Sequence, residues 1–121
     1  MVKTNLIFIR GDTSIVELTS IKALDGSEYI LSETDKILLD IKKYEYSDEV
    51  LVHKEITKAD YQPDGGLIIK FYPEDTNLLE KGEYLYDVRL YIDEYNIYTI
   101  IPVSKIVVVN SITEINEQGG V

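Results

Sequence analysis

The sequence predicts one all-β domain, an antiparallel β-sandwich of seven or eight strands with a single short helical turn. Three observations support this fold. Apolar residues recur at every second position in short segments, which is the pattern of strands with one buried face. Turn-forming residues separate these segments at short spacing. No long amphipathic segment is available to form the helices that connect parallel strands, so antiparallel pairing is expected.

Seven segments show the strand pattern. In chain order they are residues 5–10, 14–22, 36–43, 49–56, 66–72, 82–93 and 97–110. Two of them have an especially clear apolar face, made by Ile37, Leu39 and Ile41 in one and by Tyr84, Tyr86, Val88, Leu90 and Ile92 in the other. The last segment forms one or two strands, and Pro102 is expected to bend or bulge it because proline cannot donate to a β-ladder.

Residues 73–80 are the segment with a helical pattern. Pro73 and the acidic pair Glu74-Asp75 suit a first helical turn, because proline loses no hydrogen bond there and carboxylates interact favourably with a helix N-terminus. Leu78 and Leu79 can then face the core. We expect the sandwich to span residues 1–113 and residues 114–121 to form a flexible tail or a linker stub.

The composition argues against several classes of protein. The chain has 22 acidic and 12 basic side chains, and its net charge of -10 would repel nucleic-acid phosphates. It has no cysteine, which excludes disulfides, thiolate metal sites and cysteine nucleophiles. No segment is long and apolar enough to be a signal peptide or a membrane span. We therefore expect neither a nucleic acid nor a membrane as a partner.

The tripeptide Arg10-Gly11-Asp12 has the sequence of a cell-adhesion ligand. An adhesive loop must project from the body of a protein, whereas this tripeptide lies between two predicted strands with only a few residues to make the bend. Glycine supplies backbone conformations that other residues resist, and the following Asp12 and Thr13 can hydrogen-bond the turn. The sequence therefore favours a structural turn over an adhesion site.

Residues 75–86 have the spacing of a tyrosine corner. In immunoglobulin-like sandwiches, a glycine leads into a strand whose tyrosine hydroxyl bonds to backbone a few residues upstream. Asp75, Gly82 and Tyr84 stand at suitable spacing, with the Tyr84 hydroxyl expected to reach residues 75–79. The alternative is an aromatic binding platform made by Tyr84 and Tyr86, but both fall on the apolar face of the strand. We interpret them as structural and the sandwich as immunoglobulin-like.

Enzymatic sites are not indicated. His53 is the single histidine, so neither a zinc site nor a catalytic triad has its usual companions, and it is expected on an exposed or half-exposed strand face. The loop carboxylates do not follow the spacing of a calcium loop, and no phosphate-binding loop is present. We expect no catalytic residue, no metal and no cofactor.

A protein interface is the remaining candidate site. The chain has ten tyrosines and no tryptophan, and tyrosine is both enriched at interfaces and a good strand former. Seven tyrosines at strand ends, in turns or away from the core face leave the two explanations open: Tyr44, Tyr46, Tyr61, Tyr72, Tyr91, Tyr95 and Tyr98. We predict an interface on the last strand that includes Val107, Val108 and Val109, flanked by Tyr91 or Tyr98, and used for self-association or for docking onto a larger assembly.

The chain also resembles a known family. The segments "IFIRGDT", "FYPEDTNLLEKGEYLYDVRLY" and "YTIIPVSKIVVVNSIT" are similar to small domains of bacteriophage and prophage structural proteins. In particular, the chain resembles the N-terminal immunoglobulin-like domain of phage baseplate upper proteins. The resemblance covers about residues 7–113, and its most specific part consists of Asp75, Thr76, Leu78, Gly82, Tyr84, Tyr86 and Asp87.

This resemblance implies a structural or attachment module without catalysis, in the tail or baseplate of a phage or prophage particle. Its partners would be other subunits of the assembly, with a homo-oligomer as one form, and its location the virion or the host cytoplasm during assembly. The alternative function is a carbohydrate- or cell-surface-binding module. That alternative needs exposed coplanar aromatic rings, and the absence of tryptophan weighs against it.

Overall fold

The computed structural model describes residues 3–18, 29–60 and 67–112. The described residues are mostly strand, so the predicted all-β class is confirmed. The elements are β1 (Leu6–Ile9), β2 (Ser14–Leu18), β3 (Lys36–Lys42), β4 (Val52–Thr57), the 3-10 turn η1 (Lys58–Asp60), β5 (Leu67–Phe71), the helical turn α1 (Pro73–Thr76), β6 (Gly82–Asp93) and β7 (Asn96–Val109). The predicted helical turn is therefore confirmed, whereas η1 was not expected.

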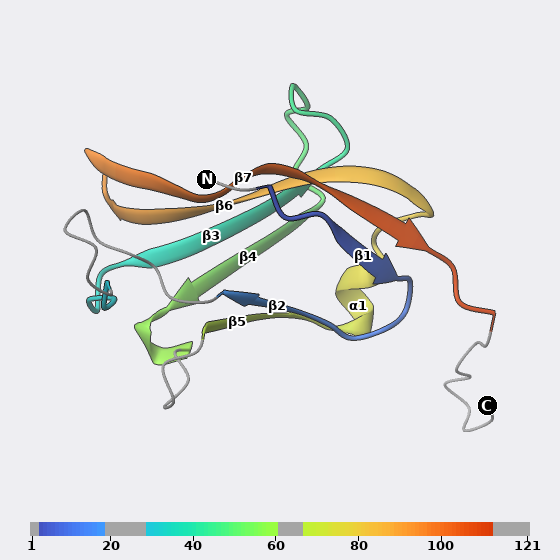
Figure 1. Ribbon diagram of the computed structural model, residues 1–121, viewed down its shortest axis with the longest axis horizontal. Helices are drawn as coiled ribbons and strands as arrows, with labels where there is room; N and C mark the ends of the chain where they lie inside the picture. The colour runs from blue at the N-terminus through green and yellow to red at the C-terminus, as the bar shows by residue number, and fades with distance from the viewer. Residues whose placement is uncertain (1–2, 19–28, 61–66, 113–121) are drawn as a thin grey trace.

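The strands form two sheets. A curled sheet of five strands has the order β1-β7-β6-β3-β4, and a small sheet pairs β2 with β5. In Figure 1 the small sheet lies below the larger one, with α1 near one end of it. The prediction of purely antiparallel pairing is wrong at one place, because β1 runs parallel to β7 with Leu6 opposite Ile106. Parallel neighbours need a long connection, and here nearly the whole chain lies between the two strands.

The hydrophobic core is built by the alternating faces of the strands. Ile37, Leu39 and Ile41 of β3 are completely buried, as the alternation predicted. The core face of β6 is buried as predicted from Tyr84 to Leu90, and Ile92 is half-buried at its end. Both strands pack in one cluster with Val16 and Leu18 of β2 and with Ile69 and Phe71 of β5.

Strand β7 is one continuous strand with an irregularity at Pro102. The register of β6 and β7 shifts at this point. Tyr86 pairs with Ser104 and Val88 pairs with Ile101, so an advance of two residues in β6 matches three residues in β7. The extra residue is a β-bulge, which leaves the proline outside the regular ladder. The Ser104 hydroxyl donates to the Pro102 carbonyl at 2.7 Å and fixes the bulge. The predicted bulge is confirmed.

Helical turn α1 begins at Pro73, as expected from the missing amide hydrogen of proline. The Asp75 carboxylate accepts the Tyr72 backbone N–H at 2.8 Å and so closes the first turn. Of the two leucines expected to face the core, Leu79 is buried but Leu78 is 63% exposed. Both leucines follow the end of α1 at Thr76, and the turn there directs Leu79 inwards and Leu78 outwards.

The predicted tail, residues 114–121, lies outside the described residues. Within the described ranges, no helix has the length and apolar character needed to cross a membrane.

Candidate functional site: exposed surfaces of the larger sheet

The tripeptide Arg10-Gly11-Asp12 forms the bend that carries the chain from β1 to β2. Gly11 has a φ of +88°, a conformation that side chains resist. The hydroxyl of Thr76 in α1 accepts the Gly11 N–H at 3.0 Å and donates to the Asp12 carbonyl at 2.9 Å. The predicted structural turn is confirmed, with α1 as its support.

The arginine of this tripeptide is also held by the protein itself. Arg10 Nε donates to the Leu79 carbonyl at 3.1 Å, and its Nη2 donates to the Asn77 carbonyl at 3.2 Å. These carbonyls follow the end of α1, where helical backbone leaves acceptors without partners. The guanidinium therefore joins the end of β1 to the segment that follows α1.

Tyr84 is 6% exposed, and its hydroxyl donates to the Glu80 carbonyl at 2.7 Å, four residues upstream. The acceptor lies one residue beyond the range expected for a tyrosine corner. Burial raises the pKa of the Tyr84 hydroxyl. Gly82 begins β6 with a φ of +152°, which favours glycine at this position. This tyrosine ties the turn before β6 to the core.

Asp75 does not contact Tyr84 through any hydrogen bond among the described residues, contrary to its expected place in the tyrosine corner. It caps α1 and accepts a 2.6 Å bond from the Lys54 ammonium group on β4. Burial would raise the pKa of Asp75, but the bonds from Lys54 and from the Tyr72 N–H outweigh it and hold the pKa below its usual value. The residue joins α1 to the larger sheet.

Tyr86 is 2% exposed, and its hydroxyl donates to the Thr4 carbonyl. Burial raises the pKa of Tyr86 to about 12. The alternative in which Tyr84 and Tyr86 form a binding platform is therefore wrong, because both rings lie inside the protein.

The predicted interface on β7 needs two corrections. Val108 is 1% exposed and belongs to the core, so it cannot contact a partner. Tyr91 and Tyr98 lie near the β6–β7 turn, at the opposite end of β7 from Val107 and Val109, so they do not flank these valines. Alternation of the strand faces places Val108 inside, and the register of β6 against β7 places the two tyrosines at the far end of the ladder.

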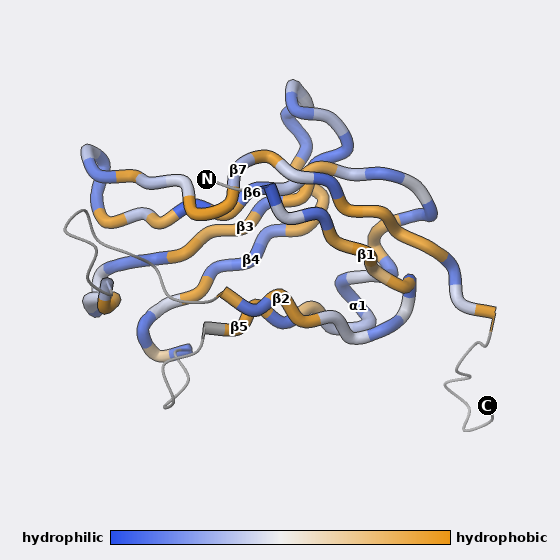
Figure 2. The backbone as a smooth tube through the Cα atoms, viewed as in Figure 1, coloured by the Kyte–Doolittle hydropathy of each residue, from blue (hydrophilic) through white to orange (hydrophobic). Residues whose placement is uncertain are grey.

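The exposed apolar surface lies instead over β1 and the end of β7. Ile7 and Ile9 of β1 stand opposite Val107 and Val109 of β7, and we call these four residues the β1–β7 strip. Ile7 is 72% and Ile9 is 40% exposed, while the two valines are half-buried. Figure 2 shows the apolar segments of both strands side by side. Val107 and Val109 of the predicted interface are thus joined by isoleucines that sequence reasoning had not assigned to it.

A charged border adjoins this strip on β6 and β7. Glu83, opposite Val107, forms a 2.9 Å ion pair with Lys105. The Lys105 hydrogen bond holds the pKa of Glu83 below its usual value. Both side chains are at least half exposed, so the pair contributes little to stability. The strip therefore has an apolar centre beside a polar rim, as protein interfaces do.

Further along the outer face, three titratable residues lie opposite one another on neighbouring strands. Asp40 of β3 stands between His53 of β4 and Asp87 of β6, and His53 bonds to Asp40. Burial raises the pKa of Asp87, and the nearby Asp40 raises it further, while Arg89 opposes the shift. His53 is exposed as predicted. A shallow hollow of about 210 Å³ lies over Asp40, Asp87 and Arg89.

In the described ranges, no group of three or more histidine, cysteine or acidic side chains is arranged to hold a metal ion. The charged side chains of Asp40 and Asp87 can instead orient a partner protein that binds this face.

The tyrosines outside the core differ in exposure. Tyr44, Tyr46, Tyr72, Tyr95 and Tyr98 are exposed, Tyr91 is half-buried, and Tyr61 lies outside the described residues. Among the exposed ones, Tyr44 and Tyr46 are stacked on each other in the loop between β3 and β4. The sequence shows only that these two tyrosines are two residues apart in a turn. This spacing does not reveal whether their rings stack or point apart.

Comparison with family models, with curated proteins and with solved structures gave no match.

Proposed function

We propose that the chain is an immunoglobulin-like β-sandwich that serves as a non-enzymatic assembly module of a phage or prophage tail or baseplate. It acts through contacts with other protein subunits. The resemblance over residues 7–113 supports the phage assignment. The observation that supports assembly is the β1–β7 strip, an apolar surface beside an unpaired sheet edge.

Strand β1 is one of the two edges of the larger sheet and has β7 as its one neighbour among the described strands. In parallel pairing, alternate residues direct their backbone groups to one side, so the others point away from that neighbour. Such an edge accepts an extended segment of another protein as an added strand. Ile7 and Ile9 would then provide the side-chain contacts, because they are the most exposed residues of the strip.

The charge of the chain favours a different subunit over a second copy. At a net charge of -10, two copies repel each other unless their contacts are complementary. A subunit that offers an extended apolar strand and carries a net positive charge fits the strip of this acidic chain better. Sedimentation of the purified chain over a concentration series measures self-association. If the chain forms a dimer through Ile7, the partner of the strip is a second copy of the chain and not a different subunit.

The alternative function is a carbohydrate-binding module. It requires exposed coplanar aromatic rings, and Tyr44 and Tyr46 are such a pair, with an interplanar angle of 6°. Sugars, however, are mostly neutral, whereas the loop that holds this pair also carries Glu45, Asp48 and Glu49. The charge around the rings favours a cationic protein segment over a sugar.

Particle incorporation tests the proposed function. The chain is tagged in the bacterium that carries the gene, particles are induced and banded on a density gradient, and the tag is detected by immunoblotting. We expect the tag in the particle band. Ile7→Asp should lower incorporation at least about tenfold, because a carboxylate in an apolar contact is strongly unfavourable.

Ile15→Asp is the matched control. Ile15 is 58% exposed on β2 and lies outside the strip, so its change should leave incorporation intact. Absence of the unmodified chain from the particles would contradict the phage assignment. Equal loss with both substitutions would contradict the assignment of the contact to the strip.

A further inference from the structure

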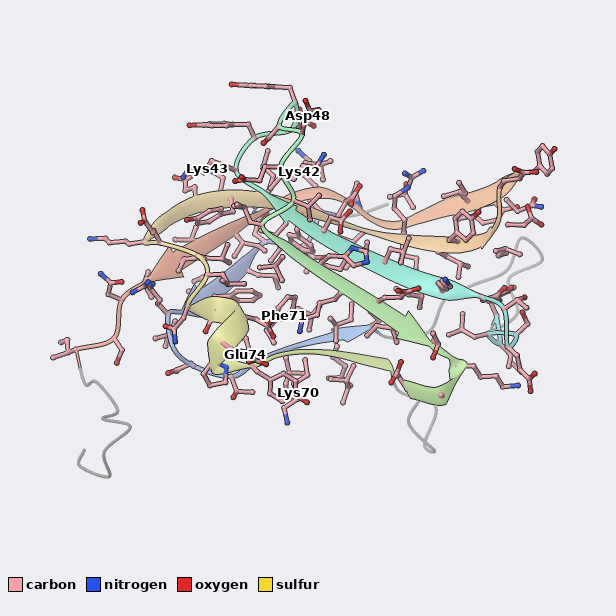
Figure 3. All side chains as sticks on the ribbon, turned by 180° about the vertical axis from the view of Figure 1, so that it is seen from behind. Lys42, Lys43, Asp48, Lys70, Phe71 and Glu74 are labelled. Atoms are coloured by element: carbon pink, nitrogen blue, oxygen red, sulfur yellow. The ribbon has the colours of Figure 1, made fainter. Side chains whose placement is uncertain are left out.

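Tyr44 and Tyr46 form an exposed aromatic pair at a loop that projects from the molecule. Their ring centroids are 5.5 Å apart and their planes differ by 6°. Tyr44 is 51% and Tyr46 is 84% exposed, so the stacked rings remain accessible to solvent. Figure 3 shows Asp48 in the part of this loop farthest from the sheet, with Lys42 and Lys43 at its base. Two large rings held parallel in solvent are suited to take a flat ligand.

The loop is fixed at its base, which positions the pair in advance of binding. The Leu51 N–H donates to the Ile41 carbonyl at 2.8 Å and closes the loop. The Ser47 N–H donates to the Tyr44 carbonyl at 3.1 Å and closes a turn that contains both tyrosines. Lys43 donates to the Glu83 carbonyl at 2.8 Å and lies over the buried Tyr84 ring. A pre-formed site loses little conformational entropy on binding.

Three carboxylates lie in the same loop as the pair. Glu45, Asp48 and Glu49 are all exposed and lie within five residues of one another in the same loop. The ion pairs found in the described part of the chain involve none of them. Lys43, the nearest basic residue in sequence to Tyr44, is engaged with the backbone of β6. From Tyr44 to Val50 the loop has no basic residue, so the segment that carries the rings is negatively charged.

We infer that the Tyr44–Tyr46 pair is a binding site for an arginine side chain of a partner protein. A guanidinium group is flat and cationic, so it can stack on a tyrosine ring while its N–H groups donate to carboxylates. A lysine ammonium group provides the charge without the flat surface. This site is distant in the sequence from the β1–β7 strip and shares no residue with it, so it does not depend on the proposed phage function.

The test is a titration of the purified chain with a capped peptide containing two arginines between glycines. The readout is the NMR shift of the tyrosine ring signals, assigned by substitution. The Tyr44 and Tyr46 signals should shift, and a peptide with citrulline in place of arginine should bind at least about fivefold more weakly, because citrulline keeps the shape but loses the charge. Raising the salt concentration should weaken the arginine complex.

Three variants assign the binding to the pair. Tyr46→Ala should weaken arginine binding about threefold to tenfold, whereas Tyr46→Phe, which keeps the ring, should stay within about twofold. Tyr95→Ala is the matched control, because Tyr95 is 87% exposed beside Asp93 and Glu94 and has no ring partner among the described residues. It should leave binding unchanged.

Equal binding of the arginine and citrulline peptides would overturn the inference, as would an equal loss in Tyr95→Ala. A shift of the same rings by a neutral oligosaccharide, without a shift by the arginine peptide, would make the pair a sugar site. None of these outcomes affects particle incorporation, which is tested through Ile7.

Discussion

Tyr84 and Tyr86 have the same spacing in the sequence as Tyr44 and Tyr46, but the two pairs lie in opposite environments. Tyr84 and Tyr86 lie on the core face of β6, 6% and 2% exposed, and each hydroxyl bonds to a backbone carbonyl. Tyr44 and Tyr46 lie in a loop, at least half exposed, and contact each other. The same residue type at the same spacing thus stabilises the fold in one pair and presents an accessible surface in the other. The difference arises because residues two apart in a strand lie on the same face, here the core face, whereas a loop imposes no such alternation.

Removing a whole ring should give the largest contrast between the pairs. Tyr86→Ala should lower the free energy of unfolding by about 3–5 kcal/mol, because it leaves a cavity in the core and an unpaired Thr4 carbonyl. Tyr46→Ala should change it by less than about 0.5 kcal/mol, since the ring is mostly in solvent. Urea unfolding of both variants measures the difference. Similar losses would show that the loop pair is a structural element.

High pH should reveal the burial of Tyr86. Its pKa in the folded protein is raised to about 12, above the ordinary value near 10. Deprotonation therefore favours the unfolded chain first, so the stability from this residue is fully present below pH 10 and is lost between about pH 10 and 12.

The matched comparison is Tyr86→Phe, which keeps the ring but cannot ionise. The unmodified protein should lose about 1–3 kcal/mol more than this variant over that pH range, as measured by urea unfolding. Parallel losses in both proteins would contradict the burial of the hydroxyl.

A hydroxyl deletion gives the smallest contrast. Tyr84→Phe should cost about 0.5–1.5 kcal/mol, the usual net value of one neutral hydrogen bond, because the bond to the Glu80 carbonyl is lost. Tyr44→Phe should have an effect close to zero, since the described residues offer its hydroxyl no hydrogen bond. Thermal unfolding of the two variants under identical conditions sharpens the comparison. A larger effect of Tyr44→Phe would reverse it.

Much of the fold could be predicted from the sequence because most strands alternate apolar and polar residues. Alternation identified the buried faces of β3 and β6, and the missing N–H of proline identified the bulge at Pro102 in β7. Alternation could not identify the edge of the sheet, because Leu6–Ile9 are all apolar and both faces of β1 look the same. For the same reason the run from Val107 to Val109 did not reveal that Val108 alone faces the core. Alternation also does not encode which strands pair, so the parallel neighbours β1 and β7 were missed.

The candidate surfaces were harder to predict than the core. The interface prediction placed Tyr91 and Tyr98 beside Val107, because it assumed an immunoglobulin strand order without the actual register. The stacking of Tyr44 and Tyr46 depends on side-chain directions within a turn, which spacing alone leaves open. The role of Asp75 was assigned to the tyrosine corner, although its nearest partners are Lys54 and the Tyr72 backbone.

The most direct test of the assembly proposal is hydroxyl-radical footprinting of the chain, free in solution and inside purified particles, read by mass spectrometry. Protection in the assembled state should fall on the exposed surfaces proposed as contacts: Ile7 and Ile9 of the strip, and the Tyr44–Tyr46 pair if its arginine partner belongs to the same particle. Ile15 and Tyr95 should be labelled equally in both states, and buried Tyr84 and Tyr86 should be protected in both. Strong protection of Ile7 and Ile9 on assembly is the predicted result, and unchanged labelling of these two residues would contradict the proposal.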